Sequence, residues 1–401
     1  MSRPPPAFLS EPRWMALWAA MFGYLLDAMD VLLYVFALPA IRAEFGLTNR
    51  EAGLVSAATL VASAAGGIAA GWISDRIGRR RTLIYTILLY SLASAGSATA
   101  SGLTHLLFWR ALVGLGLGGE WSAGAVLVAE SWPARHRAKA IGAMQSGWAL
   151  GYMAAAAVSG FVLPRWGWRT LFLAGILPAL LTLFIRRRVQ EPVIAVHSGS
   201  ASPWMLLRAP WAGITVRATA TATAVLLGYW GLFSWLPTYL SAPREAGGAG
   251  LGIVTGSRWL LLVQCGALAG YLSFGWAADR IGRRPAFLIY VLAAAMLVPI
   301  YGGTRSDALL FALGPAIGFF GSGYFSLFGA MLSELFPGGV RGIGVGFSYN
   351  FGRAVSAFAP WVVGAVADAR GYGQALAINA GFFLLAGALV FTLPETRNKD
   401  L

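Results

Sequence analysis

Apolar stretches of about 20 residues, the length that a helix needs to cross roughly 30 Å of hydrocarbon, recur along almost the whole chain. Lipid offers the backbone no hydrogen-bond partners, so each stretch must satisfy its own amides and carbonyls as a helix. Strands of a membrane barrel would alternate polar and apolar residues over about 10 positions, and no such alternation is present. Only 11% of the residues are charged, against about 25% in soluble domains. We therefore predict an all-α, polytopic membrane protein.

Twelve spans are predicted, and an even number places both termini on the same side of the bilayer. The spans are 14–41, 52–74, 82–101, 104–131, 138–162, 168–186, 213–240, 250–278, 286–303, 307–335, 342–367 and 373–393. The side that carries the termini then holds 20 of the 30 Lys and Arg residues. Cytoplasmic loops retain positive charge, so we expect both termini in the cytoplasm and the protein in the inner (plasma) membrane.

An internal repeat divides the chain into two parts. The segment Gly71–Arg80 (GWISDRIGRR) recurs as Gly275–Arg284 (GWAADRIGRR), an offset of 204 residues. A second set recurs at the same offset, Glu130 and Arg137 as Glu334 and Arg341. Independent matches at one offset indicate two structurally parallel halves. The predicted division is an N-terminal six-helix half (1–186), a cytoplasmic linker (187–212) and a C-terminal six-helix half (213–401).

The paired D-R-x-G-R-R loops at Asp75–Arg80 and Asp279–Arg284 resemble the signature loop of the major facilitator superfamily, and the resemblance covers nearly the whole chain. Asp27–Asp30 (DAMD) and Gly118–Trp121 (GGEW) resemble motifs of its metabolite–proton symporters, the aromatic-acid, sialate and lactate-type permeases. Ala28 stands where D-G-x-D has glycine, which favours the sialate and monocarboxylate group. The resemblance implies two pseudo-symmetric halves that expose one central site to each side in turn.

The repeated loop charges are candidates for a gate. The resemblance implies that Asp75 and Asp279 pair with helix ends and hold the outward-facing state. Carboxylates are stabilised at helix N-termini and beside arginines, and such contacts can differ between two conformations. The predicted gating residues are Asp75, Arg79, Glu130, Arg137, Asp279, Arg283, Glu334 and Arg341. The alternative is that these charges only anchor the loops, as loop arginines commonly do.

Three acidic residues inside predicted spans are candidates for proton coupling. A charge at mid-bilayer costs about 2.5–3.5 kcal/mol, so each one requires a reason. Asp27 and Asp30 lie one helical turn apart, and two carboxylates this close in an apolar setting do not both ionise readily. Glu120 lies in the fourth span, where Arg110 matches a superfamily arginine implicated in proton coupling. The alternatives are a wet vestibule for the aspartates and a structural pair between Glu120 and Arg110.

Arg353, midway along the eleventh span, is the candidate for binding a substrate anion, because a guanidinium can hold a carboxylate through two hydrogen bonds. Further candidates for substrate contact are Asn350, Tyr34, Gln145 and Gln264. Aromatic residues such as Trp148, Tyr229 and Trp230 could line the same cavity, although packing is their more common role. We expect a proton-coupled symporter of a small organic anion, a monocarboxylate such as lactate or pyruvate. The alternative substrates are an aromatic acid, sialic acid or a sugar.

Other function classes fit the sequence poorly. The three histidines are scattered and no phosphate-binding loop is present, so we expect neither an enzyme nor a metal or other cofactor. The net charge of +14 resides in short loop clusters, which predicts a lipid bilayer as partner and no nucleic acid. A non-transporting receptor with this fold would be expected to lose its gate residues, whereas both gate aspartates are present. We expect a monomer.

Overall fold

The computed structural model describes residues 11–47, 49–177, 180 and 203–397, and within them the chain forms helices and connecting loops without a strand. Eight helices in this described part are long and apolar enough to cross a membrane. Large apolar side chains such as Leu92, Met296 and Trp361 are exposed on the outside of the bundle. An apolar outer surface is the arrangement expected where lipid is the solvent.

The N-terminal half contains five helices and the start of the sixth predicted span. They are α1 (Pro12–Phe45), α2 (Asn49–Ile77), α3 (Arg79–Ser97), α4 (Leu103–Ser131), α5 (Ala134–Leu173) and the short η2 (Ala174–Ile176). The predicted spans 138–162 and 168–186 both begin within α5, which turns at Gly167 with a φ of 73°. Most of the sixth span beyond residue 177, and residues 187–202 of the predicted linker, lie outside the described residues.

The C-terminal half repeats this arrangement. Its elements are η4 (Pro203–Leu207), α7 (Ala212–Ser241), η5 (Arg244–Ala246), α8 (Gly252–Ile281), α9 (Arg283–Gly303), α10 (Asp307–Ser322), α11 (Phe325–Leu335), α12 (Arg341–Ser356), α13 (Ala359–Arg370), α14 (Tyr372–Ala377) and α15 (Asn379–Val390). Each of the last three predicted spans consists of two helices. In the eleventh span the break precedes Pro360, which has no amide hydrogen to donate to the carbonyl of Ser356.

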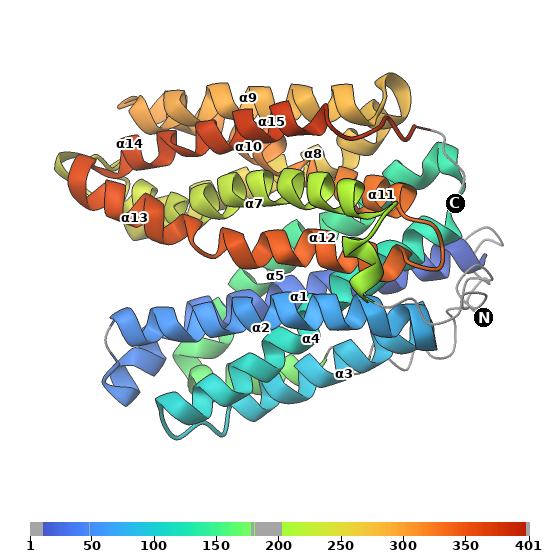
Figure 1. Ribbon diagram of the computed structural model, residues 1–401. Coiled ribbons are helices and arrows are strands. Elements are labelled where there is room, and N and C mark those ends of the chain that lie inside the picture. Colours follow the sequence, from blue (N-terminus) through green and yellow to red (C-terminus); the bar gives the residue numbers. More distant parts are fainter. Residues whose placement is uncertain (1–10, 48, 178–179, 181–202, 398–401) are drawn as a thin grey trace, which may run out of the picture.

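The two halves lie one above the other in Figure 1, with both described chain ends at the same end of the bundle. We call that end the terminal end and the opposite one the far end. Gly78 and Gly282 directly precede α3 and α9 at the terminal end, with φ values of 98° and 104°. Only glycine adopts such values without strain, which explains why the repeated loop carries glycine there.

Close helix contacts join the halves at glycines that obey the 204-residue repeat. A Cβ atom on Gly71 of α2 would collide with the carbonyl of Gly342 in α12, and one on Gly275 of α8 with the carbonyl of Ala138 in α5. Within the N-terminal half, α4 approaches α2 in the same way through Gly114. Gly114 therefore serves close helix packing.

Candidate substrate and proton site

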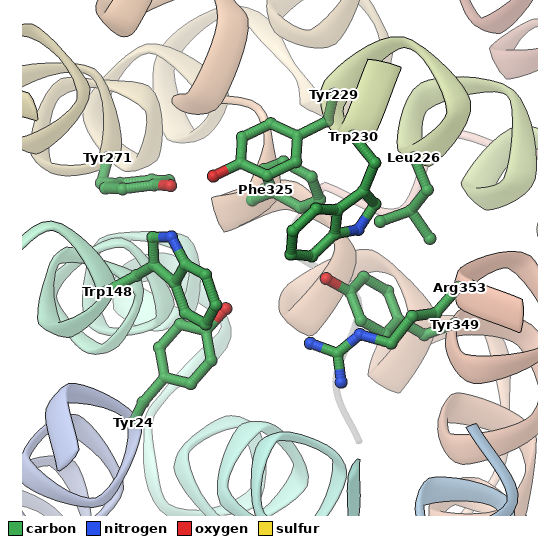
Figure 2. A pocket seen from close by; sticks show the side chains of 9 residues that line it. All are labelled: Tyr24, Trp148, Leu226, Tyr229, Trp230, Tyr271, Phe325, Tyr349 and Arg353. Atoms are coloured by element: carbon green, nitrogen blue, oxygen red, sulfur yellow. The ribbon is translucent and has the colours of Figure 1, made fainter. Parts of the chain in front are cut away.

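A small cavity lies between the two halves and is lined mainly by aromatic rings (Figure 2). Its lining residues are Tyr24 and Trp148 from the N-terminal half and Leu226, Tyr229, Trp230, Tyr271, Phe325, Tyr349 and Arg353 from the C-terminal half. The cavity volume is about 10 Å³, room for a single water molecule. An organic molecule can therefore enter only if the rings move apart.

Arg353 supplies the cation of this cavity. Its Nη1 donates to Ser63 Oγ of α2 at 2.9 Å, and its guanidinium lies 5.7 Å from the ring centre of Tyr349. Its buried Nε has no hydrogen-bond partner among the described residues. Figure 2 shows the guanidinium pointing into the space opposite Tyr24 and Trp148. A buried guanidinium with an unused donor is suited to receive a carboxylate.

Asp27 and Glu120 are both buried beside this cavity without lining it. Asp27 interacts electrostatically with Arg353 and with Glu120. The carboxylate of Glu120 occupies the space that a side chain at Gly23 of α1 would take. Asp27 Oδ2 has no hydrogen-bond partner among the described residues, and Glu120 interacts with Tyr90 of α3. Carboxylates buried in an apolar setting without an ion pair are more stable in the protonated, neutral form.

Asp30 lies in a different environment from Asp27. It accepts hydrogen bonds from Ser94 and from Arg110, whose Nη1 lies 3.2 Å from Asp30 Oδ2. The guanidinium of Arg110 also lies 5.0 Å from the ring centre of Tyr34. Arg110 therefore pairs with Asp30 rather than with Glu120, the partner considered from the sequence. The two aspartates of the first span have separate partners.

The other predicted substrate contacts do not line the cavity in this conformation. Gln145 accepts a hydrogen bond from the indole of Trp121 at 2.8 Å, and Trp121 stacks on Tyr349 across the two halves at 3.7 Å between ring centres. Asn350 donates to Ser122 of α4 at 2.9 Å. Gln264 is buried in α8. Gln145 therefore supports the cavity wall through Trp121, whereas Asn350 joins α12 to α4.

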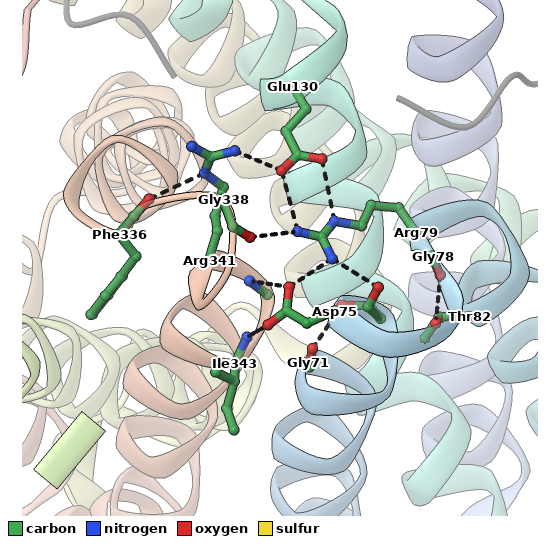
Figure 3. A network of polar contacts seen from close by, with 12 residues as sticks. Gly71, Asp75, Gly78, Arg79, Thr82, Glu130, Phe336, Gly338, Arg341 and Ile343 are labelled. Carbon is green, nitrogen blue, oxygen red and sulfur yellow. Dashed lines mark hydrogen bonds and ion pairs between the residues drawn. The ribbon is translucent and has the colours of Figure 1, made fainter. Parts of the chain in front are cut away.

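A first charge cluster, made of Asp75, Arg79, Glu130 and Arg341, joins the halves at the terminal end (Figure 3). Arg341 donates to Glu130 at 2.6 Å, and Arg79 donates to both carboxylate oxygens of Glu130 at 3.2 Å. Asp75 accepts from the amides of Gly342 and Ile343 at 3.0 and 2.8 Å. Because these amides belong to the first turn of α12, Asp75 caps a helix of the opposite half.

A second charge cluster, made of Asp279, Arg283, Glu334 and Arg137, stands at the repeat-related positions. Arg137 donates to Glu334 across the halves at 2.9 Å, and Arg283 bonds Asp279 at 2.6 Å. Here the chain end takes part, because Thr396 donates to Glu334 at 2.6 Å. Each cluster thus contains one arginine contributed by the other half, Arg341 in the first and Arg137 in the second; we call this the arginine exchange. All eight predicted gating residues lie in these two clusters.

Sequence reasoning missed several residues of the central cavity. Tyr24 lies one turn before Asp27 on the same helix face, and this spacing could have identified it. Tyr271, Phe325 and Ser63 carry no such signal, because their role depends on how the two halves meet. A ring in a membrane helix is indistinguishable from an ordinary packing residue until its neighbours are known.

Comparison with known proteins agrees with this architecture. A sequence profile described as the Major Facilitator Superfamily matches residues 20–257 and, in a second match, 246–401. A "Probable 4-methylmuconolactone transporter" of Cupriavidus pinatubonensis is 36% identical, covering 95% of this chain and 90% of its own. The niacin transporter NiaP of Acinetobacter baylyi is 29% identical, covering 96% and 94%.

Among solved structures, the proton:xylose symporter XylE superposes with a TM-score of 0.80 at 20% identity, over 97% of this chain and 98% of that one. At that identity the likeness concerns the fold. The profile, the relatives and this superposition confirm the predicted fold class, and they confirm a membrane transporter of small organic compounds rather than an enzyme.

Proposed function

The chain belongs to the major facilitator superfamily, and we propose that it is a proton-coupled symporter of an aromatic or unsaturated carboxylate. The observation that carries this proposal is one guanidinium, Arg353, in a cavity otherwise lined by rings and Leu226. The guanidinium provides the charge and two-point geometry for a carboxylate, and the rings offer flat apolar faces to a conjugated or aromatic body. The relatives named for niacin and 4-methylmuconolactone support the same class of substrate.

Lactate and pyruvate, the substrates expected from the sequence, match the charge of this cavity but not its aromatic walls. Either would satisfy Arg353 but has no flat body to place against Trp148, Trp230 or Tyr229. A site of this composition gains most of its apolar binding energy from stacked rings. The aromatic-acid alternative is therefore better supported than the monocarboxylate one.

The proton would reside on Asp27 or Glu120, the two buried carboxylates beside the cavity. Without a proton, these groups would place bare negative charge in a medium of low dielectric. Arg353 can offset one negative charge, either that of Asp27 or that of the substrate. In this mechanism protonation of Asp27 leaves Arg353 available for the substrate carboxylate. The charges of the site are then balanced while the cavity is closed to both sides of the membrane. This competition for one arginine couples proton and substrate.

The halves would alternate about this site. The two charge clusters hold the terminal end together, so we assign this conformation to the stage in which that end is closed. Passage of the substrate requires both clusters to open. We further propose that the terminal end faces the cytoplasm at the inner membrane, that residues 187–212 connect two six-helix halves (1–186 and 213–401), and that one chain suffices.

Uptake into proteoliposomes with an imposed inward proton gradient tests this function. The panel is nicotinate, benzoate, lactate, pyruvate, sialic acid and glucose, with nicotinamide as the uncharged counterpart of nicotinate. We expect gradient-dependent uptake of nicotinate or benzoate that exceeds that of lactate and of nicotinamide. Uptake of glucose alone, or uptake indifferent to a proton ionophore, would refute the proposal.

The Arg353→Gln variant tests the role of the arginine. Losing a charge-assisted hydrogen bond of about 1.5–3 kcal/mol should reduce uptake at low substrate concentration by about tenfold or more. Arg258→Gln is the matched control, because Arg258 is an exposed arginine of the same half outside the cavity lining. Equal effects of the two substitutions would remove Arg353 from the binding site.

A further inference from the structure

A second, larger cavity of about 600 Å³ lies at the far end of the C-terminal half. Three chain segments form it: residues 244–248 after α7, residues 302–305 around the end of α9, and residues 367–374 at the junction of α13 and α14. This junction lies at the end of the bundle opposite both termini (Figure 1). The volume is within the range of about 300–1,000 Å³ typical of ligand pockets.

The corresponding place in the N-terminal half is bridged by side chains. There Arg169 bonds Glu44 at 2.7 Å and the carbonyl of Ala100 at 3.1 Å. The indole of Trp168 also donates to Glu44 at 2.7 Å. The Glu44–Arg169 ion pair and its hydrogen bonds thus connect the segments around residues 44, 100 and 169 at the far end of this half.

The repeat places different residues at these positions in the C-terminal half. At the offset of 204, Glu44, Ala100 and Arg169 correspond to Gly248, Thr304 and Gly373, all of which line the large cavity. The backbone still matches, because Gly167 and Gly371 share this offset and have φ values of 73° and 83°. Here the segments are joined by the backbone, with the amide of Gly373 donating to the carbonyl of Gly247 at 3.0 Å. Among its described residues, the C-terminal half therefore has no counterpart of the Glu44–Arg169 ion pair at the place where the cavity lies.

The charges on the cavity wall favour an anion. Three arginines line it, Arg244, Arg305 and Arg370, against the two carboxylates of Glu245 and Asp368. Arg244 is bonded to Asp307 at 2.6 Å. Arg305 and Arg370 are exposed and have no ion pair within 4.0 Å among the described residues. Each of these two guanidinium groups can hold a carboxylate through two hydrogen bonds.

We propose that this cavity, which we call the far-end site, binds a small organic carboxylate through Arg305 and Arg370. The identity of the ligand, an anion of the transported class, rests on the proposed function. The existence of the site does not, because it depends on residues remote from Arg353. Bound there, the anion takes the place that the Glu44–Arg169 pair fills in the other half and raises the local substrate concentration beside the far end.

Saturation-transfer NMR on the purified full chain measures benzoate binding directly. The Arg353→Gln background reduces binding at the central cavity, and we expect the benzoate signal to persist there. Adding Arg305→Gln and Arg370→Gln should lower this signal by about fivefold or more. No benzoate signal on the Arg353→Gln background would overturn the far-end site, whereas the proposed function would be judged separately from uptake by the unmodified protein.

A filling variant tests the cavity without changing its charge. A Cβ atom on Gly303 meets open space, and this glycine does not have a positive φ, so Gly303→Trp should fold and occupy the cavity. Gly102→Trp, at an equally open position at the far end of the N-terminal half, is the control. We expect Gly303→Trp to abolish the benzoate signal on the Arg353→Gln background and Gly102→Trp to preserve it. An unchanged signal in Gly303→Trp, equal binding of benzamide, or preferential binding of choline would overturn the carboxylate site.

Discussion

The two charge clusters at the terminal end share their residue types, yet they are connected differently. In the first cluster, Asp75 pairs with Arg79 of its own half at 2.6 Å and also bonds two backbone amides of the opposite half. Asp279 in the second cluster bonds Arg283 of its own half, and its Oδ2 has no hydrogen-bond partner among the described residues. From the other half, Lys139 Nζ lies 3.9 Å from this oxygen. The repeat therefore preserves the arginine exchange but not the helix cap.

The reason for this difference lies one turn earlier in the chain. Helix α5 begins at Ala134, so the amides of Ala138 and Lys139 are already used by the carbonyls of its own first turn. Helix α12 begins only at Arg341, because Gly338 and Gly339 occupy the corresponding positions and glycine disfavours helix. The amides of Gly342 and Ile343 therefore remain free for Asp75. Two glycines decide which half supplies the capped helix.

Removing the shared carboxylate of the first cluster should have the largest effect. Glu130→Gln leaves Arg341 buried without its anion and Arg79 with Asp75 alone, and breaking a buried pair costs about 3–5 kcal/mol. We expect a clear fall in the melting temperature in detergent and nearly complete loss of uptake. Full uptake by this variant would show that the cluster does not stabilise the closed terminal end.

Neutralising the two repeated aspartates should separate the clusters. Asp75→Asn weakens two charge-assisted bonds across the halves and should lower the initial rate of uptake by about tenfold, equivalent to about 1.4 kcal/mol. Asp279→Asn weakens a bond within one half, which need not break when the halves separate, and should lower the rate by about twofold. Proteoliposome uptake under one proton gradient compares the two. Equal losses would mean that the helix cap adds nothing to the arginine exchange.

Replacing the two glycines before α12 tests whether they determine where this helix begins. Gly338→Ala with Gly339→Ala should extend α12 by a turn and draw the amides of Gly342 and Ile343 away from Asp75. We expect a decrease in uptake of about threefold, smaller than for Asp75→Asn because the ion pair with Arg79 remains. In this double variant, a further Asp75→Asn substitution should then cost less than it does alone, and a double-mutant cycle measures that difference.

The smallest effect is expected at the far end, where the described ion pairs lie within each half. The Trp168 indole and the Arg169 guanidinium hold the pKa of Glu44 below its usual value. Their stabilisation is therefore present at neutral pH and is lost as the pH falls through the lowered pKa. Because the side chains of Glu44 and Arg169 are both over 40% exposed, Glu44→Gln should lower the free energy of unfolding by under about 1 kcal/mol, with little change in uptake. The difference in melting temperature from the unmodified protein should shrink between pH 7 and pH 4.

The sequence by itself determined the all-helical membrane class, the division into two related halves and the membership of both charge clusters. Those features follow from local hydropathy and from a repeat at one fixed offset, which need no knowledge of contacts. The sequence also singled out Arg353, because an arginine within an apolar span is costly wherever the helix packs.

Only the tertiary structure decided the partners of these residues. In the structure Arg110 pairs with Asp30 rather than Glu120, and Gln145 and Asn350 bond other side chains and do not line the cavity. It also placed rings from both halves around Arg353 and left a cavity where the Glu44–Arg169 pair has no counterpart. A buried group can meet several partners on one helix face, and which one it meets depends on the packing of helices far apart in the chain.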